Sequence, residues 1–156
     1  MKISDLLTEE LVATNLAGSS KDDIINAIVN LVAISPKVVD KEKVREAVFE
    51  RETIMSTGVG DGFAIPHGKT DAVSDIVGAF AVTAEPIDYE SLDEKPVRLV
   101  FLLVSKANMV GPHIKLLSKI SRLMNKPDFR NKLLEVKSPQ EIIEMFKQEE
   151  AIYFEG

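Results

Sequence analysis

The chain contains only two histidines, and one of them, His67, stands between a proline and a glycine in the stretch STGVGDGFAIPHGKT, residues 56–70. A turn would prefer Asn, Asp or Gly at such a place, so local structure does not explain the imidazole well. Because the unperturbed pKa of histidine is about 6.5, a neutral, nucleophilic imidazole is present at neutral pH. The alternative is an incidental polar residue at the end of a strand.

The second histidine and one arginine could complete a site. His113 is expected in the first turn of a helix, where free backbone N–H groups favour a neutral imidazole and a nearby anion. Arg51 follows Val44 and Val48 at helical spacing, so it either extends to solvent and compensates the helix C-terminus or points into a site. His113 could likewise simply complete a helix start. Together, a nucleophile and cationic donors are what phosphoryl transfer requires.

Helices are predicted on both sides of the centre of the chain, at residues 19–37, 41–52, 111–126, 127–136 and 138–150. Ser20 and Asp40 can cap the first two, and Ser138 with Glu141 can form a capping box for the last. The first helix shows an apolar face of Ile24, Ile25, Ile28, Leu31 and Val32. The helix that contains His113 is expected to bury Ile114, Leu117, Ile120 and Met124.

The centre of the chain is rich in strand-forming residues. Residues 62–65 form a short apolar segment ended by Pro66, and residues 75–85 carry β-branched and aromatic side chains. Residues 97–104 are an almost unbroken apolar run, typical of a central strand covered on both faces. The polar stretch 85–96 between them is interpreted as a connection with a short strand. Helices that bracket a sheet predict a layered α/β or α+β domain, and without a linker or repeat the chain, 1–156, is expected to be one domain.

Composition excludes several classes of protein. The formal net charge of −6 argues against nucleic-acid binding, which relies on basic surface. No apolar run approaches the roughly 18–20 residues that span a bilayer, so direct membrane insertion is not expected. The absence of cysteine excludes disulfides, thiol catalysis and thiolate metal sites. The acidic opening MKISDLLTEE lacks the layout of a signal peptide, and a cytoplasmic protein is expected.

Hydrolase and metalloenzyme chemistry finds little support. The Gly-x-Ser-x-Gly pattern of a serine hydrolase is absent, and so is the HExxH motif of many zinc enzymes. Asp61 and Asp71 flank the His67 segment, but two histidines would need carboxylates placed by the fold to bind zinc. No metal and no cofactor is expected.

Two stretches of the chain resemble a known family. ERETIMSTGVGDGFAIPHGKT, residues 50–70, is similar to the active-site region of IIA proteins of the bacterial phosphoenolpyruvate-dependent sugar phosphotransferase system, in the fructose–mannitol class. VRLVFLLVSKANMVGPHIKLLSKISRLM, residues 97–124, matches the second part of that region, although its loop at 104–113 varies in length and composition. The resemblance extends over essentially the whole chain, including the opening TEELVATNLAGSSKDDII. That class also contains the nitrogen-regulatory IIA proteins.

The resemblance implies a fold and three site residues. The fold is a mixed β-sheet of about five strands flanked by helices on both faces. His67, in the PHG motif, matches the histidine that takes the phosphoryl group. His113, in PHIKLL, matches a second active-site histidine that supports the first, and Arg51 matches the arginine near the phosphohistidine.

The resemblance leaves two functions open. In the first, the protein is a phosphotransferase that accepts a phosphoryl group from the phosphocarrier HPr, or its nitrogen-branch counterpart, and passes it to a cysteine of a IIB component, with fructose-type transport favoured. In the second, phosphorylation of the same histidine controls binding to other proteins. Which sugar is served is not predicted.

Overall fold

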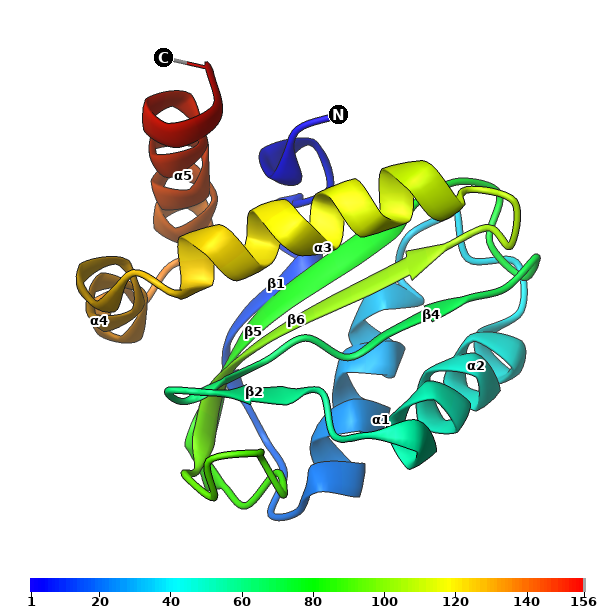
Figure 1. Ribbon diagram of the computed structural model, residues 1–156, viewed down its shortest axis with the longest axis horizontal. Helices are drawn as coiled ribbons and strands as arrows, with labels where there is room; N and C mark the ends of the chain where they lie inside the picture. The colour runs from blue at the N-terminus through cyan, green and yellow to red at the C-terminus, as the bar shows by residue number, and fades with distance from the viewer. Residues whose placement is uncertain (156) are drawn as a thin grey trace.

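The computed structural model describes residues 1–155, in which six strands form one mixed sheet (Figure 1). The order is β1-β5-β6-β3-β2, and β4 also pairs with β6. The strands are β1 (Val12–Leu16), β2 (Gly58–Gly60), β3 (Phe63–Ala64), β4 (His67–Lys69), β5 (Val77–Ile87) and β6 (Val97–Ser105). Because β3 and β4 follow one another along the same edge of β6, both parallel to it, the sheet is about five strands wide, as predicted.

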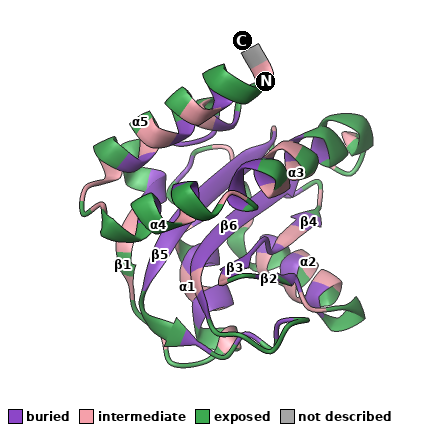
Figure 2. Cartoon of the chain, turned by 60° about the vertical axis from the view of Figure 1, so that its left-hand side comes forward, coloured by how far each residue is buried: buried purple, intermediate pink, exposed green. Residues whose placement is uncertain are grey.

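Helices cover both faces of this sheet, so the predicted α/β architecture is confirmed. One face carries α1 (Lys21–Val32) and α2 (Lys41–Ile54). The other carries α3 (Val110–Met124), α4 (Pro127–Glu135), α5 (Pro139–Glu150) and the 3-10 turn η1 (Ile3–Asp5). The remaining short segments are η2 (Glu9–Leu11) and η3 (Ala151–Glu155). Figure 2 shows the central strands β5 and β6 almost wholly buried between these layers.

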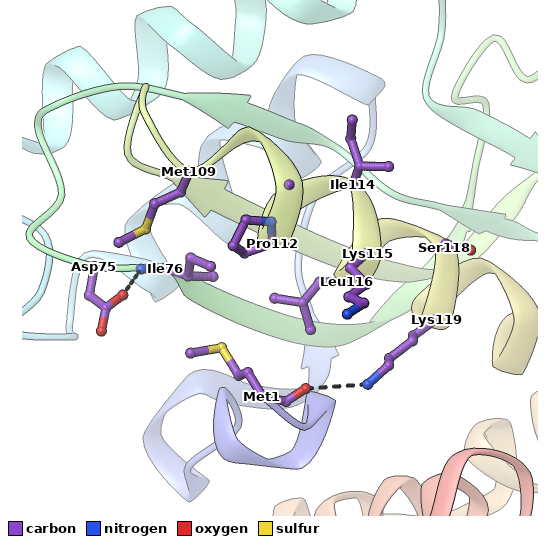
Figure 3. Close-up of a pocket in the computed structure, with 11 residues that line it drawn as sticks. Met1, Asp75, Ile76, Met109, Pro112, Ile114, Lys115, Leu116, Ser118 and Lys119 are labelled. Carbon is purple, nitrogen blue, oxygen red and sulfur yellow. Dashed lines mark hydrogen bonds between the residues drawn. The ribbon is translucent and has the colours of Figure 1, made fainter.

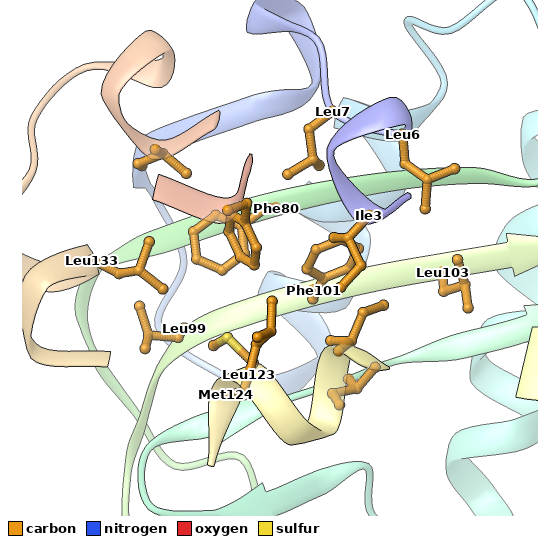
Figure 4. Close-up of a cluster of buried hydrophobic side chains, with 14 of the residues drawn as sticks. Ile3, Leu6, Leu7, Phe80, Leu99, Phe101, Leu103, Leu123, Met124 and Leu133 are labelled. Carbon is orange, nitrogen blue, oxygen red and sulfur yellow. The ribbon is translucent and has the colours of Figure 1, made fainter. Parts of the chain in front are cut away.

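The apolar run of β6 divides its side chains between two cores. Leu99, Phe101 and Leu103 pack in the cluster under α3, α4 and α5, which Figure 4 shows. Val100, Leu102 and Val104 pack on the opposite face, against α1 and α2. Successive side chains of a strand alternate between faces, so a strand buried on both sides reads as a continuous apolar run, and the prediction for this segment is confirmed.

The helix starts follow the predicted capping chemistry. The Ser20 side chain accepts from the N–H of Asp23, and the Asp40 side chain accepts from the N–H groups of Glu42 and Lys43. Ser138 accepts from the N–H of Glu141, but the Glu141 carboxylate accepts from the Ser138 hydroxyl and not from its backbone N–H, so the predicted capping box forms in one direction only. Side-chain oxygens at these positions satisfy backbone donors that have no partner within the helix.

Two expectations about the elements need correction, and one strand was not expected. On α3 the buried apolar residues are Leu116, Ile120, Leu123 and Met124, whereas Ile114 is 60% exposed and Leu117 only partly buried, because the helix is rotated toward the Phe-rich core. The separate short strand expected within 85–96 is wrong, since β5 itself continues to Ile87, which pairs with Val97. β1, which the sequence pattern does not predict, pairs in parallel with β5.

The last turn of α5 is tied to the start of the chain. Glu150 is 2% exposed, and its carboxylate accepts from the N–H groups of Ile3 and Ser4, the latter at 2.7 Å. These donors open a 3-10 turn and have no partner within it, so the carboxylate takes the place of a helix cap.

No helix in the described residues is long and apolar enough to cross a membrane.

Candidate functional site

The structure brings the two histidines together at the edge of the sheet. His67 begins β4, which runs beside the end of β6 with His67 opposite Leu103. After β6 ends at Ser105, the chain turns into α3, whose first turns carry His113. The two imidazole rings lie with their centroids 5.5 Å apart. Residues 46 positions apart in sequence therefore face one site because a parallel strand pair places both segments at the same end of the sheet.

His67 presents one ring nitrogen to the site. The ring is half-buried, and its Nδ1 lies 2.8 Å from the carbonyl oxygen of Ile65. A carbonyl only accepts, so Nδ1 carries the proton and Nε2 keeps the free lone pair in the neutral ring. Burial lowers the pKa of His67 below its usual value, and the positive charge of Arg51 lowers it further, against the opposing hydrogen bond to Ile65. The nucleophilic form therefore persists below pH 6.5.

His113 is more deeply buried and has a fixed orientation. It is 4% exposed, and its Nδ1 shares a hydrogen bond of 2.7 Å with the hydroxyl of Ser105. Burial lowers the pKa of His113 to about 4, helped by the nearby His67 and Lys69. The ring is therefore neutral at physiological pH, and its Nε2 is left for the site. Sequence reasoning missed Ser105, although it is the polar residue that ends an otherwise apolar strand.

Arg51 lines the same hollow as both histidines. This hollow, about 490 Å³ in volume, is bounded by Arg51 and Ile54 of α2, by residues 67–69 of β4 and by the start of α3. The Arg51 side chain is partly exposed, and its Nη1 donates to the carbonyl oxygen of Met55 at 2.9 Å. This bond also satisfies a carbonyl at the end of α2, while the role of Arg51 in a site stays a prediction.

The site is built from both faces of the sheet. Arg51 comes from α2, which covers one face, and His113 from α3, which covers the other, while His67 lies on the edge strand between them. Gly68 allows this approach, because a Cβ there would lie 3.2 Å from the backbone carbonyl carbon of Ala47 on α2. Lys69 adds a positive charge that sequence reasoning did not single out.

A larger hollow lies elsewhere on α3. It has a volume of about 920 Å³ and separates the N-terminal residues from α3, as Figure 3 shows. Its lining includes Met1, Ile76, Met109, Lys115 and Lys119, and it shares Ile114 with the site. No histidine lines it, whereas both His67 and His113 line the smaller hollow.

The carboxylates near the His67 segment do not assemble into a metal site. Within residues 1–155, no group of three or more His, Cys, Asp or Glu side chains is arranged to hold a metal ion. Asp61 lies in the turn after β2 with a φ of 55°, and its side chain is 4.0 Å from Lys95 Nζ.

Two histidines and an arginine thus line one open hollow at the edge of a mixed sheet. Residues 5–149 match the family model of the phosphoenolpyruvate-dependent sugar phosphotransferase system, EIIA 2, and the chain belongs to that family. The resemblance drawn from the sequence is thereby confirmed.

Relatives of both branches are similar to this chain. It is 38% identical over 140 residues to the fructose-specific EIIA component of Haloferax volcanii, covering 90% of this chain and 91% of the relative. It is 37% identical over 144 residues to a nitrogen regulatory protein of Bradyrhizobium diazoefficiens, covering 91% and 92%. It is 36% identical over 148 residues to the fructose-specific EIIABC component of Bacillus subtilis, covering 95% of this chain and only 23% of that longer protein.

A solved structure supports the fold. The nitrogen regulatory protein IIA-Ntr of Neisseria meningitidis superposes with a TM-score of 0.86 at 32% identity, over 92% of this chain and 98% of that one. The mixed sheet with helices on both faces is therefore the fold of this family.

Proposed function

We propose that the protein is a phosphoryl carrier that accepts a phosphoryl group from phospho-HPr on Nε2 of His67 and passes it to a cysteine of a IIB component. The observation that carries this proposal is the free Nε2 of His67, which faces a hollow shared with His113 and Arg51. The fructose-specific relatives favour a fructose-type transport route.

The transfer needs no metal and no net proton change at the acceptor nitrogen. The Nε2 lone pair of His67 attacks the phosphorus of the donor phosphohistidine, and the donor N–P bond breaks with its electron pair returning to the donor ring. In the second step a cysteine thiolate of IIB attacks the same phosphorus and forms an S–P bond, and the Nε2–P bond breaks with its electron pair returning to the His67 ring. The proton stays on Nδ1 of His67 throughout and remains hydrogen-bonded to the carbonyl oxygen of Ile65.

The surrounding side chains stabilise the charge on the phosphoryl oxygens. Arg51 offers a planar fork of N–H donors, and Lys69 adds a second cation. His113 is held by Ser105, so its Nε2 can contact the phosphoryl group in one fixed orientation. Preorganised donors of this kind contribute without reorganising during the transfer.

The rim of the hollow suits a protein partner. Ile54 is 77% exposed and Ile114 60% exposed, and they come from the helices on the two sides of the site. Met55, 57% exposed, follows Ile54. Exposed apolar side chains around a polar centre mark an interaction surface, so we infer that HPr and IIB dock here in turn.

A regulatory role is the second candidate. The nitrogen regulatory relatives, at 37% identity in sequence and a TM-score of 0.86 in structure, favour it about as strongly as the fructose relatives favour transport. In that role phosphorylation of His67 would change binding to other proteins. A IIB component that drains the phosphoryl group from the phosphorylated protein separates the two, because only the transport role requires that step.

The test of the proposal is phosphorylation in vitro. The protein is incubated with phosphoenolpyruvate, enzyme I and HPr, and its mass is measured before and after acid treatment, with His67→Ala as the control. One acid-labile phosphoryl group that is absent from the variant supports the carrier role. No gain with a competent HPr from the same cell contradicts it.

A further inference from the structure

Next to the site, a buried carboxylate stands at the centre of a polar cluster. Glu52 follows Arg51 on α2 and is 8% exposed. Its carboxylate accepts from the N–H of Thr57 at 2.7 Å, from the Thr57 hydroxyl and from the Tyr89 hydroxyl at 3.3 Å, and it pairs with Lys21 Nζ at 2.9 Å. A buried charge is costly unless it is paired and hydrogen-bonded, and Glu52 is both. The cluster thus connects the start of α1, the end of α2, the residue before β2 and the loop after β5.

From Thr57 a chain of hydrogen bonds leads to the imidazole of His67. The carbonyl oxygen of Thr57 accepts from the N–H of Ile65 at 3.0 Å. The carbonyl oxygen of Ile65 in turn accepts from Nδ1 of His67 at 2.8 Å. The carboxylate of Glu52 thus holds, through Thr57, the segment that orients the proposed nucleophile.

A second connection leads from the same carboxylate to Arg51. The guanidinium of Arg51 donates to the carbonyl oxygen of Met55, in the loop between α2 and β2. Thr57, two residues further along that loop, is held by Glu52. Arg51 and His67 are therefore positioned through one short loop, residues 55–57, and Glu52 anchors that loop to the helix that carries Arg51.

The other side of this loop is also held closely. Gly58 has no room for a side chain, since a Cβ there would lie 2.3 Å from Ser91 Oγ. Tyr89, from the loop after β5, carries Lys21 over its ring at 5.0 Å. Burial and the charge of Glu52 raise the pKa of Tyr89, which keeps the phenol protonated as a hydrogen-bond donor.

We propose that Glu52 is a positioning residue for phosphoryl transfer, which sets the relative placement of Arg51 and His67 by anchoring Thr57. The proposal rests on the proposed function of the site. Glu52 does not touch the phosphoryl group, and its effect is on the geometry of the two residues that do. Misplacement by about 1 Å can slow a reaction by up to about a hundredfold, so such an anchor has a measurable consequence.

The main experiment compares two buried carboxylates. Glu52→Gln removes the charge at the site, and Glu150→Gln makes the same change in a carboxylate that accepts two backbone N–H bonds at the chain start. Transfer rates from phospho-HPr are measured over a range of HPr concentrations. In Glu52→Gln we expect kcat to fall about tenfold, with KM changed less than about twofold, and in Glu150→Gln we expect both to stay within about twofold of wild type.

A pair of substitutions at Thr57 tests the same anchor without touching a charge. Thr57→Val removes the hydroxyl that bonds Glu52 and is expected to lower kcat, whereas Thr57→Ser restores that hydroxyl and should recover most of the rate. This pair carries the test if Glu52→Gln does not fold. Wild-type kcat in both Glu52→Gln and Thr57→Val, or an equal loss in Glu150→Gln, overturns the proposal.

An NMR titration of the His67 ring gives a readout that does not depend on transfer. The negative charge of Glu52 opposes the lowering of the pKa of His67, so Glu52→Gln should lower that pKa further and Glu150→Gln should leave it unchanged. If the wild type accepts no phosphoryl group, the proposed function fails, and the His67 ring resonances at a pH where the ring is neutral then test the placement of His67 separately from the effect of the Glu52 charge. A His67 resonance and pKa in Glu52→Gln that match wild type would overturn it.

Discussion

At the scale of single residues, the two imidazoles are suited to different tasks. His67 is half-buried, with Nδ1 occupied by Ile65 and Nε2 open to the hollow. His113 is buried and hydrogen-bonded to Ser105, so a partner protein reaches it less easily than His67, whereas a group bound at His67 lies within its reach. The proposed acceptor and the proposed supporting group are therefore distinguished by their environments, since both are histidines.

The fork of Arg51 can be tested separately from its charge. Arg51→Lys keeps the charge but loses the planar pair of donors, so the transfer rate from phospho-HPr should fall about tenfold. Arg45→Lys is the matched control, since Arg45 lies on the same helix and bonds Glu42 and Asn30 away from the site. Rates measured by rapid mixing should be unchanged in the control. Equal rates in both variants would remove the guanidinium from the mechanism.

His113 is expected to assist transfer without being the acceptor. In His113→Ala the mass gain of one phosphoryl group should remain, while the rate of its transfer from HPr and to IIB falls about tenfold. Ser105→Ala, which frees the ring of its hydrogen bond, should give a smaller loss in the same direction. A variant that takes no phosphoryl group at all would make His113, not His67, the residue to examine as acceptor.

At the scale of elements, the site depends on how closely α2 approaches β4. The contact is made at Gly68, where a Cβ would lie only 3.2–3.3 Å from the backbone of Ala47 and Val48. β4 is only three residues long and is held by β6 on one side, so its position relative to α2 is set by this contact. Arg51 lies one turn further along α2, at the hollow that His67 faces.

Adding one methyl group at this contact should disturb both stability and transfer. Gly68→Ala places a Cβ 3.2–3.3 Å from the α2 backbone, and since a helix backbone cannot move aside, we expect a loss of about 1–3 kcal/mol and a slower transfer. Gly111→Ala, in the first turn of α3 with nothing within 4 Å, is the control and should be neutral or stabilising. Denaturant titrations compare the two. A fully stable Gly68→Ala would show that α2 and β4 have room to separate.

Elements were predicted best where local chemistry determines them. Ser20 and Asp40 cap helices as their spacing predicts, and the run of β6 reads directly as a buried central strand. β1, β2 and β4 were not predicted, because strands of three to five residues with glycine or polar side chains depend on pairing with distant segments.

The candidate site residues that lie within recognisable sequence motifs were predicted. His67, His113 and Arg51 are brought to one hollow, although their roles stay predictions. The bonds of Ser105 and Glu52 could not be predicted, since each partner is set by where another segment returns along the fold. Ser105 reaches His113 because β6 ends there.

At the scale of the whole molecule, the sheet separates two cores, and the site bridges them at one edge. On one side, Phe146 of α5 packs edge-on against Phe80, Phe101 and Phe129. On the other, α1 and α2 cover the sheet with aliphatic side chains. Helices from both layers contribute to the site, so its geometry depends on the integrity of the complete fold.

Acid should destabilise the fold in part through His113. The pKa of His113 falls from 6.5 to about 4 on folding, so the unfolded chain binds its proton first, and stability is lost as the pH falls from about 6.5 to about 4. The contribution is up to about 3 kcal/mol. Urea titrations across this range should show a flatter pH dependence for His113→Gln than for wild type. Parallel pH curves for the two proteins would contradict a buried, neutral His113.

The strands at the edge of the sheet that carries the site have a consequence for behaviour at high concentration. β2 and β4 are three residues long, and β2 has glycine at two of its positions. Open strand edges are templates on which other chains can add and aggregate, and short, glycine-containing edges give such chains little to pair with. In the proposed function, HPr and IIB both approach the edge strand that carries His67. Because β4 is short, the His67 imidazole can be exposed at this edge without a long row of unpaired backbone groups on which a second copy of the chain could add a strand.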